Sequence, residues 1–328
     1  MEKKSLLKNL SRLVGAHVSA AGGVELAIER AAEIGCNCAQ VFSGSPRVWA
    51  KRPLEQHAVD KIYSNKEKLS VEPIFTHAIY LTNLASDKPE LRRKSINSLT
   101  YDLKFDALVK GGGVVVHLGS HQGRGWEAVR EQVAEDIKEI LNQTPEESTL
   151  LIENSAGQNG KLCSDLSEIK WLLDRVGETK RLGWCFDTCH AHAAGYYLGE
   201  NAPELPDESG IVGEESDLFG NKKPIKKSAK NKAPKNPVRG QALVEIEKYN
   251  LLGSLRLIHV NGSRDPFASG RDRHANLGEG ELSDGDLSCF LNQPQVAHLP
   301  LVLEVPGEGK GPDAKNVARL RSYIQIGG

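Results

Sequence analysis

GVVVH at residues 113–117 is one of six short apolar runs in this sequence that end on a residue able to bind a metal ion. Each run is rich in β-branched residues or flanked by turn residues, as expected for a buried parallel strand. The other five runs are EPIFTH (72–77), LLIE (150–153), GWCFD (183–187), LRLIH (255–259) and LVLE (301–304). The final residues of the six runs are His77, His117, Glu153, Asp187, His259 and Glu304.

The spacing of these strand ends fits a repeating strand and helix. Successive ends lie 40, 36, 34, 72 and 45 residues apart, and the long interval contains an insertion. Two further strands are predicted upstream, at 13–19 (LVGAHVS) and 38–44 (CAQVFSG). Helices are predicted near 24–35, 55–69, 88–110, 125–142, 164–176, 240–252, 283–293 and 312–325. Eight alternations of strand and helix predict an α/β TIM (β/α)8 barrel, whose chemistry lies at the carboxyl ends of the strands.

The length and composition suit a single domain. With 328 residues and 39% hydrophobic content, the chain can build one large core. We expect an N-terminal extension at 1–12, a barrel domain at 13–328, and a charged insertion at about 200–240 after the sixth strand. Seven acids between Glu200 and Asp217 precede KKPIKKSAKNKAPKNPVR (222–239), which has eight bases and no acid. This insertion is either a solvated surface loop or a basic arm that grips phosphate backbone.

Charge and cysteine content narrow the functional classes. The formal net charge is −1, so nucleic-acid binding would need a local patch or bound metal. No stretch approaches the roughly 20 apolar residues that span a bilayer, which excludes a membrane protein. The six cysteines show no paired CxxC pattern and are too sparse for a disulfide scaffold. The sequence predicts a reduced intracellular protein of the cytoplasm or nucleus, not a secreted one.

Three more metal-seeking residues lie close to the strand ends in sequence. His190 follows Asp187 in DTCH, and Asp272 and His274 lie two apart in RDRH, where an extended chain directs both side chains the same way. A lone histidine at a strand end is usually a framework group, but six aligned positions are not explained in that way. Five imidazoles and four carboxylates favour zinc, with manganese as an alternative, and their number indicates more than one ion.

The motifs around these residues resemble the endonuclease IV family of zinc-dependent apurinic/apyrimidinic (AP) endonucleases. That family has a TIM-barrel fold and acts in DNA base excision repair. The resemblance runs from about residue 13 to the C-terminus, apart from the insertion. It is carried by GAHVSAAGG (15–23), THAIYLTNL (76–84), HLGSH (117–121), IENSAGQ (152–158), FDTCHAHAAGY (186–196) and DRHANLGEG (272–280).

The resemblance implies three zinc ions per chain. It assigns the first ion to His77, His117 and Glu153, and makes Glu153 a bridge to the second. It completes the second ion's site with Asp187, His259 and Glu304, and assigns the third ion to His190, Asp272 and His274. Glu153 and Glu304 are the expected catalytic carboxylates, with Glu304 orienting the attacking hydroxide.

The resemblance also implies contacts with double-stranded DNA. Arg47 in FSGSPRVW, and Tyr80 with Leu81 in HAIYL, occupy the positions of side chains that open the duplex at the lesion. Physically, an apolar wedge and a guanidinium can fill the space left by an extruded sugar. The alternatives are barrel-top packing for Tyr80 and Leu81, and a surface ion pair for Arg47.

Three features depart from the family pattern. The sequence after His259 reads Asn-Gly-Ser-Arg (261–264), Val-Pro follows Glu304, and the insertion lengthens the loop after the sixth strand. The first change puts the surroundings of His259 and a nearby phosphate contact in doubt. The insertion lies on the active-site face, where it could alter how DNA is engaged.

The sequence therefore predicts a monomeric nuclease that cuts the phosphodiester 5′ to an abasic site. The expected products carry a 3′-hydroxyl and a 5′-deoxyribose phosphate, and removal of 3′-blocking groups would follow from the same chemistry. Two other classes stay open at this point. One is a metal-dependent sugar isomerase or epimerase on the same barrel, and the other is a non-catalytic binder of DNA lesions.

Overall fold

A computed structural model describes residues 12–177, 180–203, 211–216, 222–226 and 235–324. Most of the predicted N-terminal extension, at 1–11, lies outside the described residues. Eight parallel strands close into a barrel in the order β1-β14-β11-β6-β5-β4-β3-β2, which confirms the TIM barrel. These strands are β1 (Val14–His17), β2 (Cys38–Phe42), β3 (Ile74–His77), β4 (Val114–Val116), β5 (Leu150–Glu153), β6 (Leu182–Asp187), β11 (Leu255–His259) and β14 (Leu301–Leu303).

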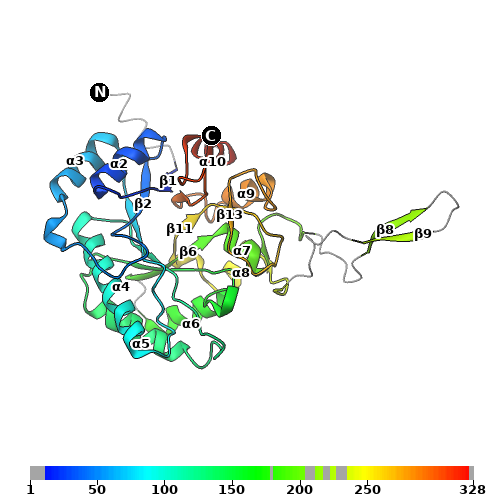
Figure 1. Cartoon of the computed structure of the whole chain (residues 1–328), viewed down its shortest axis with the longest axis horizontal. Coiled ribbons are helices and arrows are strands. Elements are labelled where there is room, and N and C mark those ends of the chain that lie inside the picture. Colours follow the sequence, from blue (N-terminus) through cyan, green and yellow to red (C-terminus); the bar gives the residue numbers. More distant parts are fainter. Residues whose placement is uncertain (1–11, 178–179, 204–210, 217–221, 227–234, 325–328) are drawn as a thin grey trace.

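Helices surround the barrel and cover the outer faces of its strands (Figure 1). The predicted ones are found within a few residues of their expected bounds. They are α2 (Val24–Glu33), α3 (Val59–Leu69), α4 (Pro89–Val109), α5 (Arg130–Asn142), α6 (Leu166–Val176), α8 (Ala242–Lys248), α9 (Asp284–Leu291) and α10 (Ala314–Tyr323). Short 3₁₀ turns lie at Leu54–Gln56, Gln158–Gly160 and Leu252–Ser254.

Helix α6 shows how the sequence builds this outer layer. Asp165 begins it by accepting a hydrogen bond from the Ser167 backbone at 2.9 Å, and Gly177 ends it with φ 82°. The buried face consists of Leu166, Ile169, Leu172 and Val176, which recur at helical spacing and pack against the barrel. Because Leu172 is fully buried, truncating it to Ala should cost about 2–5 kcal/mol of stability.

A second apolar layer fills the inside of the barrel. It takes one inward-facing residue from each of seven strands and forms a cluster separate from the helix-facing core: Cys38, Phe75, Val115, Leu151, Cys185, Leu257 and Val302. The matching position on β1 is Gly15, where an added Cβ would lie only 2.6 Å from Cys38 Sγ. The barrel is therefore plugged, and this layer is the floor beneath whatever lies at its carboxyl end.

The sixth strand leads into elements that the sequence did not predict. Helix α7 (Thr188–Ala194) begins directly at the end of β6, because Asp187 accepts a hydrogen bond from the His190 backbone at 2.8 Å. Strand β7 (Tyr196–Tyr197) then pairs with β10 (Gly240–Gln241), so that the insertion leaves and rejoins the barrel at neighbouring points. A two-residue ladder of β12 (Gly262–Ser263) and β13 (His274–Ala275) follows β11.

The insertion is not a wholly irregular loop. Strands β8 (Ile211–Ser216) and β9 (Lys222–Lys226) pair as an antiparallel hairpin, which projects away from the barrel in Figure 1. The sequence predicted neither of these two strands. Blockwise charge with Pro carries no alternating apolar pattern, which is the local sequence signal for a strand.

All six cysteines are described, and all are free thiols, five of them buried. Among the described residues, none of the helices has the length and apolar character needed to cross a bilayer.

Candidate metal centre

The carboxyl end of the barrel carries a ring of eight polar side chains directly above the apolar floor. Each lies two residues beyond the inward-facing residue of its strand, and strand alternation therefore directs it to the same interior. The ring consists of His17, Gln40, His77, His117, Glu153, Asp187, His259 and Glu304. All six predicted strand-end residues belong to this ring. Gln40 was not predicted, although its position two residues after Cys38 marks it.

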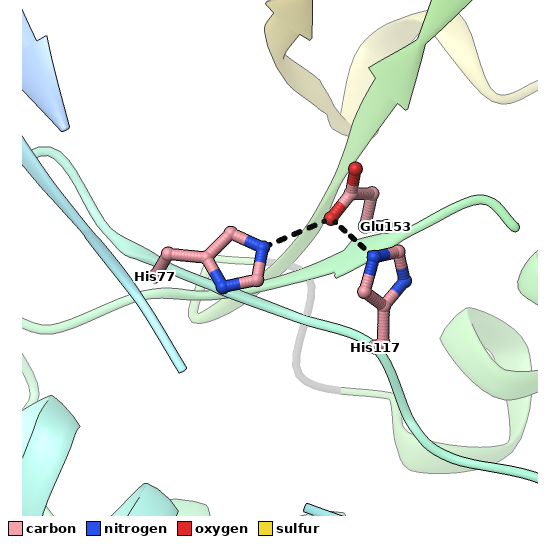
Figure 2. Close-up of side chains that lie close together, drawn as sticks. All are labelled: His77, His117 and Glu153. Atoms are coloured by element: carbon pink, nitrogen blue, oxygen red, sulfur yellow. Dashed lines mark hydrogen bonds and ion pairs between the residues drawn. The ribbon is translucent and has the colours of Figure 1, made fainter. Parts of the chain in front are cut away.

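The first cluster lies between β3, β4 and β5. His77 Nε2 and His117 Nε2 lie 3.3 and 3.2 Å from the same oxygen, Glu153 Oε2, and both rings point toward it (Figure 2). The ligand atoms of these three residues all lie within 4.8 Å of one another, close enough to hold one metal ion.

The second cluster lies next to the first and shares Glu153 with it. His259 Nδ1 lies 3.0 Å from Glu153 Oε1, 3.3 Å from Glu304 Oε2 and 4.0 Å from Asp187 Oδ2. Glu153 therefore turns one oxygen to each cluster. Such an arrangement suits a carboxylate that bridges two cations.

The third cluster lies above β6. Its ligand atoms within 4.8 Å of one another come from Asp187, His190 and His274. Asp272 lies at its edge, with Oδ1 3.0 Å from His190 Nε2 and 3.6 Å from His274 Nε2. The expected set of His190, Asp272 and His274 is thus brought together. Asp187 joins that set, while the other oxygen of Asp272 accepts a hydrogen bond from Lys161 Nζ at 3.0 Å.

The imidazole hydrogen bonds fit metal ligation. Nδ1 of His77, His190 and His274 lies 2.7, 3.0 and 3.2 Å from a backbone carbonyl oxygen, which can only accept a hydrogen. A proton on each Nδ1 leaves the lone pair of Nε2 directed into the clusters. His259 is reversed, because its Nε2 contacts Gln40 Oε1 at 2.8 Å and its Nδ1 faces the carboxylates. Metal-binding histidines ordinarily donate their second nitrogen in this way.

Electrostatics favours positive charge among these groups. Burial by itself would raise the pKa of Glu153 and Glu304, but neighbouring histidines hold both well below the usual range. Burial would likewise lower the pKa of His190, yet Asp187 and Asp272 hold it well above 6.5. His117 has fewer acidic neighbours, and burial lowers its pKa to about 4. The carboxylates thus require compensating cations, which protons or metal ions can supply.

Buried amide side chains hold the ligands in place. Asn154 Nδ2 donates to the Asp187 backbone oxygen at 3.2 Å, and its Oδ1 accepts from the Asp187 backbone N–H at 2.6 Å. Asn261 donates to Asp187 Oδ2, and Gln40 donates to Glu304 Oε1, both at 2.6 Å. The role of Asn154 was missed because an Asn directly after a strand-end ligand has no pattern of its own.

The departure at 261–264 keeps the polar framework. Asn261 is fully buried and contacts the ligands, and Gly262 pairs with Ala275 beside His274. A Cβ at Gly262 would lie 2.9 Å from the Asn276 carbonyl oxygen, so glycine lets the RDRH segment approach closely. Arg264 is exposed, at the outer end of this ladder.

A cavity of about 380 Å³ opens above the metal-seeking residues. Its walls include Tyr80, whose side chain is 68% exposed and meets Phe42 edge-on with ring centroids 5.3 Å apart. Leu81 is 37% exposed beside it. Side chains that only pack on the barrel top would be buried. Tyr80 and Leu81 are both exposed instead. Arg47 is also exposed and forms no ion pair within the described part of the chain.

Known proteins resemble this chain in sequence and in fold. A family model described as "Xylose isomerase-like TIM barrel" matches residues 28–325. A protein of Halothermothrix orenii named "Probable endonuclease 4" is 32% identical over 309 residues, which are 94% of this chain and 99% of that protein. The crystal structure of endonuclease IV from Thermus thermophilus is 30% identical, with a TM-score of 0.73 over 95% of this chain and 98% of the other. The chain belongs to the endonuclease IV family.

Membership of the endonuclease IV family separates this chain from others with the same barrel. A D-tagatose 3-epimerase-like protein also matches, with a TM-score of 0.63 over 96% of this chain and 97% of the other, but at 16% identity. That likeness concerns the fold alone. The likeness to endonuclease IV extends to sequence over nearly the whole chain, and together with the three clusters it indicates a metal-dependent nuclease.

Proposed function

We propose that this protein is a zinc-dependent AP endonuclease of DNA base excision repair. It hydrolyses the phosphodiester 5′ to an abasic site and leaves a 3′-hydroxyl and a 5′-deoxyribose phosphate. The observation that carries the proposal is the sharing of carboxylates, since Glu153 belongs to the first and second clusters and Asp187 to the second and third. Three adjacent sites suit a phosphodiester better than a sugar hydroxyl.

The donor set determines the cofactor we propose. The nine ligand residues supply imidazole nitrogen and carboxylate oxygen without a buried thiolate, which suits zinc, with manganese as a substitute. Zinc ions bound there would supply Lewis-acid stabilisation of phosphoryl oxygens and lower the pKa of a water molecule. The ligands are His77, His117, Glu153, Asp187, His190, His259, Asp272, His274 and Glu304.

Glu153 and Glu304 are the proposed catalytic carboxylates. Glu153 lies between the first two clusters with both oxygens in use. Glu304 lines the open cavity, and Gln40 and His17 contact its Oε1 at 2.6 and 3.1 Å. Held in this orientation, Glu304 can accept a hydrogen bond from the attacking water and align it with the phosphorus atom.

The substrate we propose is double-stranded DNA with an abasic site. Tyr80 lines the cavity from the turn after β3, Leu81 follows it in the chain, and Arg47 lies in the loop after β2, at the same end of the barrel. These exposed side chains would occupy the opened duplex while the extruded sugar phosphate enters the cavity. Removal of 3′-blocking groups would use the same residues. We further propose a monomer that acts inside the cell, in the cytoplasm or nucleus.

One experiment separates this function from its rivals. Purified protein is analysed for zinc, then incubated with a duplex carrying one abasic-site analogue and with the matched intact duplex. About three zinc ions per chain and a single cut 5′ to the lesion support the proposal. A protein with one or two divalent ions that interconverts ketoses, or a metal-free protein that binds the lesion uncut, would overturn it.

A further inference from the structure

A second cavity adjoins the metal centre on the side of the third cluster. It measures about 550 Å³ and is lined by three segments, residues 157–159, 235–236 and 270–273, which together we call the basic groove. Segment 235–236 is the end of the charged insertion, and segment 270–273 contains the ligand Asp272. The groove therefore joins the insertion to the active site.

The groove has excess positive charge. Lys235 is exposed, and the side chains of Arg271 and Arg273 are 44% and 57% exposed. Both guanidinium groups contact one carboxylate, Asp265, at distances of 3.3 and 2.5 Å, and Asp265 itself is only 2% exposed. One buried carboxylate cannot neutralise two guanidinium groups. Among the described residues no second carboxylate contacts these guanidinium groups, so their remaining N–H groups are available to an anion in the groove.

Asn236 ties the three segments together. Its side-chain Nδ2 donates to the backbone oxygens of Ala156 at 3.1 Å and Ala193 at 2.9 Å. The backbone N–H groups of Lys235 and Asn236 both donate to the Ala268 oxygen, at 3.0 and 2.9 Å. The backbone of Lys235 is thus fixed at the groove, and its exposed side chain can reach an anion there.

Asp272 lies in the walls of both the metal cavity and the basic groove. A carboxylate here would repel a phosphate passing between the cavities, but Lys161 Nζ contacts its outer oxygen at 3.0 Å and His190 Nε2 its inner oxygen at 3.0 Å. These two groups neutralise the negative charge of Asp272, so that an anionic chain can pass between the two cavities.

We propose that the basic groove binds the phosphodiester backbone of the DNA strand that leaves the metal centre, with Lys235 as a direct phosphate contact. The proposal rests on the proposed function, because it takes the metal cavity as the position of the cleaved phosphodiester. A continuous polyanion bound there must leave the cavity on some side. On this side the groove provides cationic side chains, and the charge of Asp272 at its entrance is neutralised by Lys161 and His190.

The test compares the salt dependence of binding for wild type and Lys235→Gln, with a duplex containing one abasic-site analogue. Loss of one phosphate contact lowers the slope of log affinity against log salt by roughly 0.9. The ratio of the two affinities should therefore shrink about 3.5-fold between about 50 and about 200 mM salt. Lys235→Arg should keep the wild-type slope. Parallel lines for wild type and Lys235→Gln would overturn the proposal.

Lys104→Gln is the matched control, since Lys104 is an exposed lysine on α4. The Lys104→Gln variant should show the wild-type slope of log affinity against log salt. A decrease in slope equal to that of Lys235→Gln would show a non-specific charge effect and would overturn the groove proposal. The wild-type cleavage assay keeps the two proposals apart. A wild-type protein that does not cut the abasic duplex refutes the function, whereas cutting with parallel salt lines refutes the groove alone.

A second experiment combines the Lys235→Gln variant with shortened duplexes to find which DNA flank Lys235 contacts. The duplex is shortened on one side of the lesion or on the other, and binding is measured for wild type and Lys235→Gln. Shortening one flank should weaken wild type more than the variant, while shortening the other should weaken both equally. Equal losses in both proteins on both flanks would contradict a groove on one side of the metal centre.

Discussion

Asn261 links two ligands that come from different strands: its Nδ2 donates to Asp187 Oδ2 at 2.6 Å, and its Oδ1 accepts the Glu304 backbone N–H at 2.8 Å. The first ligand ends β6 and the second follows β14, with β11 between them in the barrel. A single amide therefore fixes the Asp187 carboxylate relative to the backbone that carries Glu304. Its own backbone is fixed by Thr188 Oγ1, which donates to the Asn261 oxygen at 2.8 Å.

Asn261→Ala should weaken metal retention by about 10-fold to 100-fold, because Asp187 loses the donor that orients it. The change also removes the acceptor of the partly buried Glu304 backbone N–H, at a cost of about 1 kcal/mol. Zinc content during dialysis against a graded chelator measures the first effect, and urea unfolding the second. Asn316→Ala is the control, since Asn316 is a buried Asn in the first turn of α10 whose Oδ1 accepts the Leu277 backbone N–H. It should lose stability and keep its metal.

Glu304→Gln should reduce cleavage of an abasic duplex at least about 100-fold while DNA binding stays measurable. The amide matches the carboxylate in shape but cannot accept a proton, and it no longer balances His259, which lies 3.3 Å from Oε2. Single-turnover cleavage and zinc content are measured together. Glu308→Gln, at an exposed glutamate in the same loop, should cut at the wild-type rate. Wild-type cleavage by Glu304→Gln with saturating zinc would remove this residue from the mechanism.

The strand ends could be predicted from sequence because two local rules coincide there. An apolar run gives the strand, and period-two alternation then places the residue after the run, such as His77 or Glu153, above the inward-facing Phe75 or Leu151. Closure of the barrel then brings these strand ends together around one interior. The same rule would have found Gln40, two residues after Cys38, had polar residues without metal affinity been included.

Contacts that depend on loop paths could not be predicted in this way. Asp187 joins His190 and His274 in the third cluster because α7 begins at the end of β6 and because β13 pairs with β12. Both elements are too short for a periodic signal. Lys161 reaches Asp272 across 111 positions of sequence, and no local pattern encodes such a contact.

Replacing Tyr80 and Leu81 with Ala should weaken the preference for abasic over intact duplex without changing the metal content. Both side chains are exposed and largely apolar, so they can fill the space in an opened base stack. Competition binding between the two duplexes measures the preference. Val244→Ala, which removes a 51% exposed apolar side chain on α8, is the control and should leave the preference intact. Unaltered selectivity in the double variant would mean that Tyr80 and Leu81 have no part in recognition.

Asp106 should make stability depend on pH between about 4 and about 7. Burial raises its pKa from 3.8 to about 7, against a hydrogen bond from the Gly113 backbone and the charge of Lys66. The unfolded chain loses this proton near pH 4, while the folded protein keeps it to about pH 7. The contribution of protonated Asp106 to the free energy of unfolding is therefore fully present below about pH 4 and is lost as the pH rises through about 7. Asp106→Asn cannot titrate, so the wild-type unfolding free energy should fall relative to this variant across that interval. A constant difference would contradict a buried, protonated Asp106.

The basic half of the insertion is tested separately from the groove. Six lysines, leaving Lys235 in place, are changed to Gln: Lys222, Lys223, Lys226, Lys227, Lys230 and Lys232. If this segment lies along DNA, the slope of log affinity against log salt should fall by roughly 0.9 for each phosphate contact removed. Cleavage at saturating substrate should be nearly unchanged, because all nine proposed ligands lie outside the altered stretch. A solvated spacer, whose acids at 200–217 offset its bases, instead gives the wild-type slope. Binding isotherms at several salt concentrations decide between them, and superimposable slopes would restrict DNA contact to the barrel face and the groove.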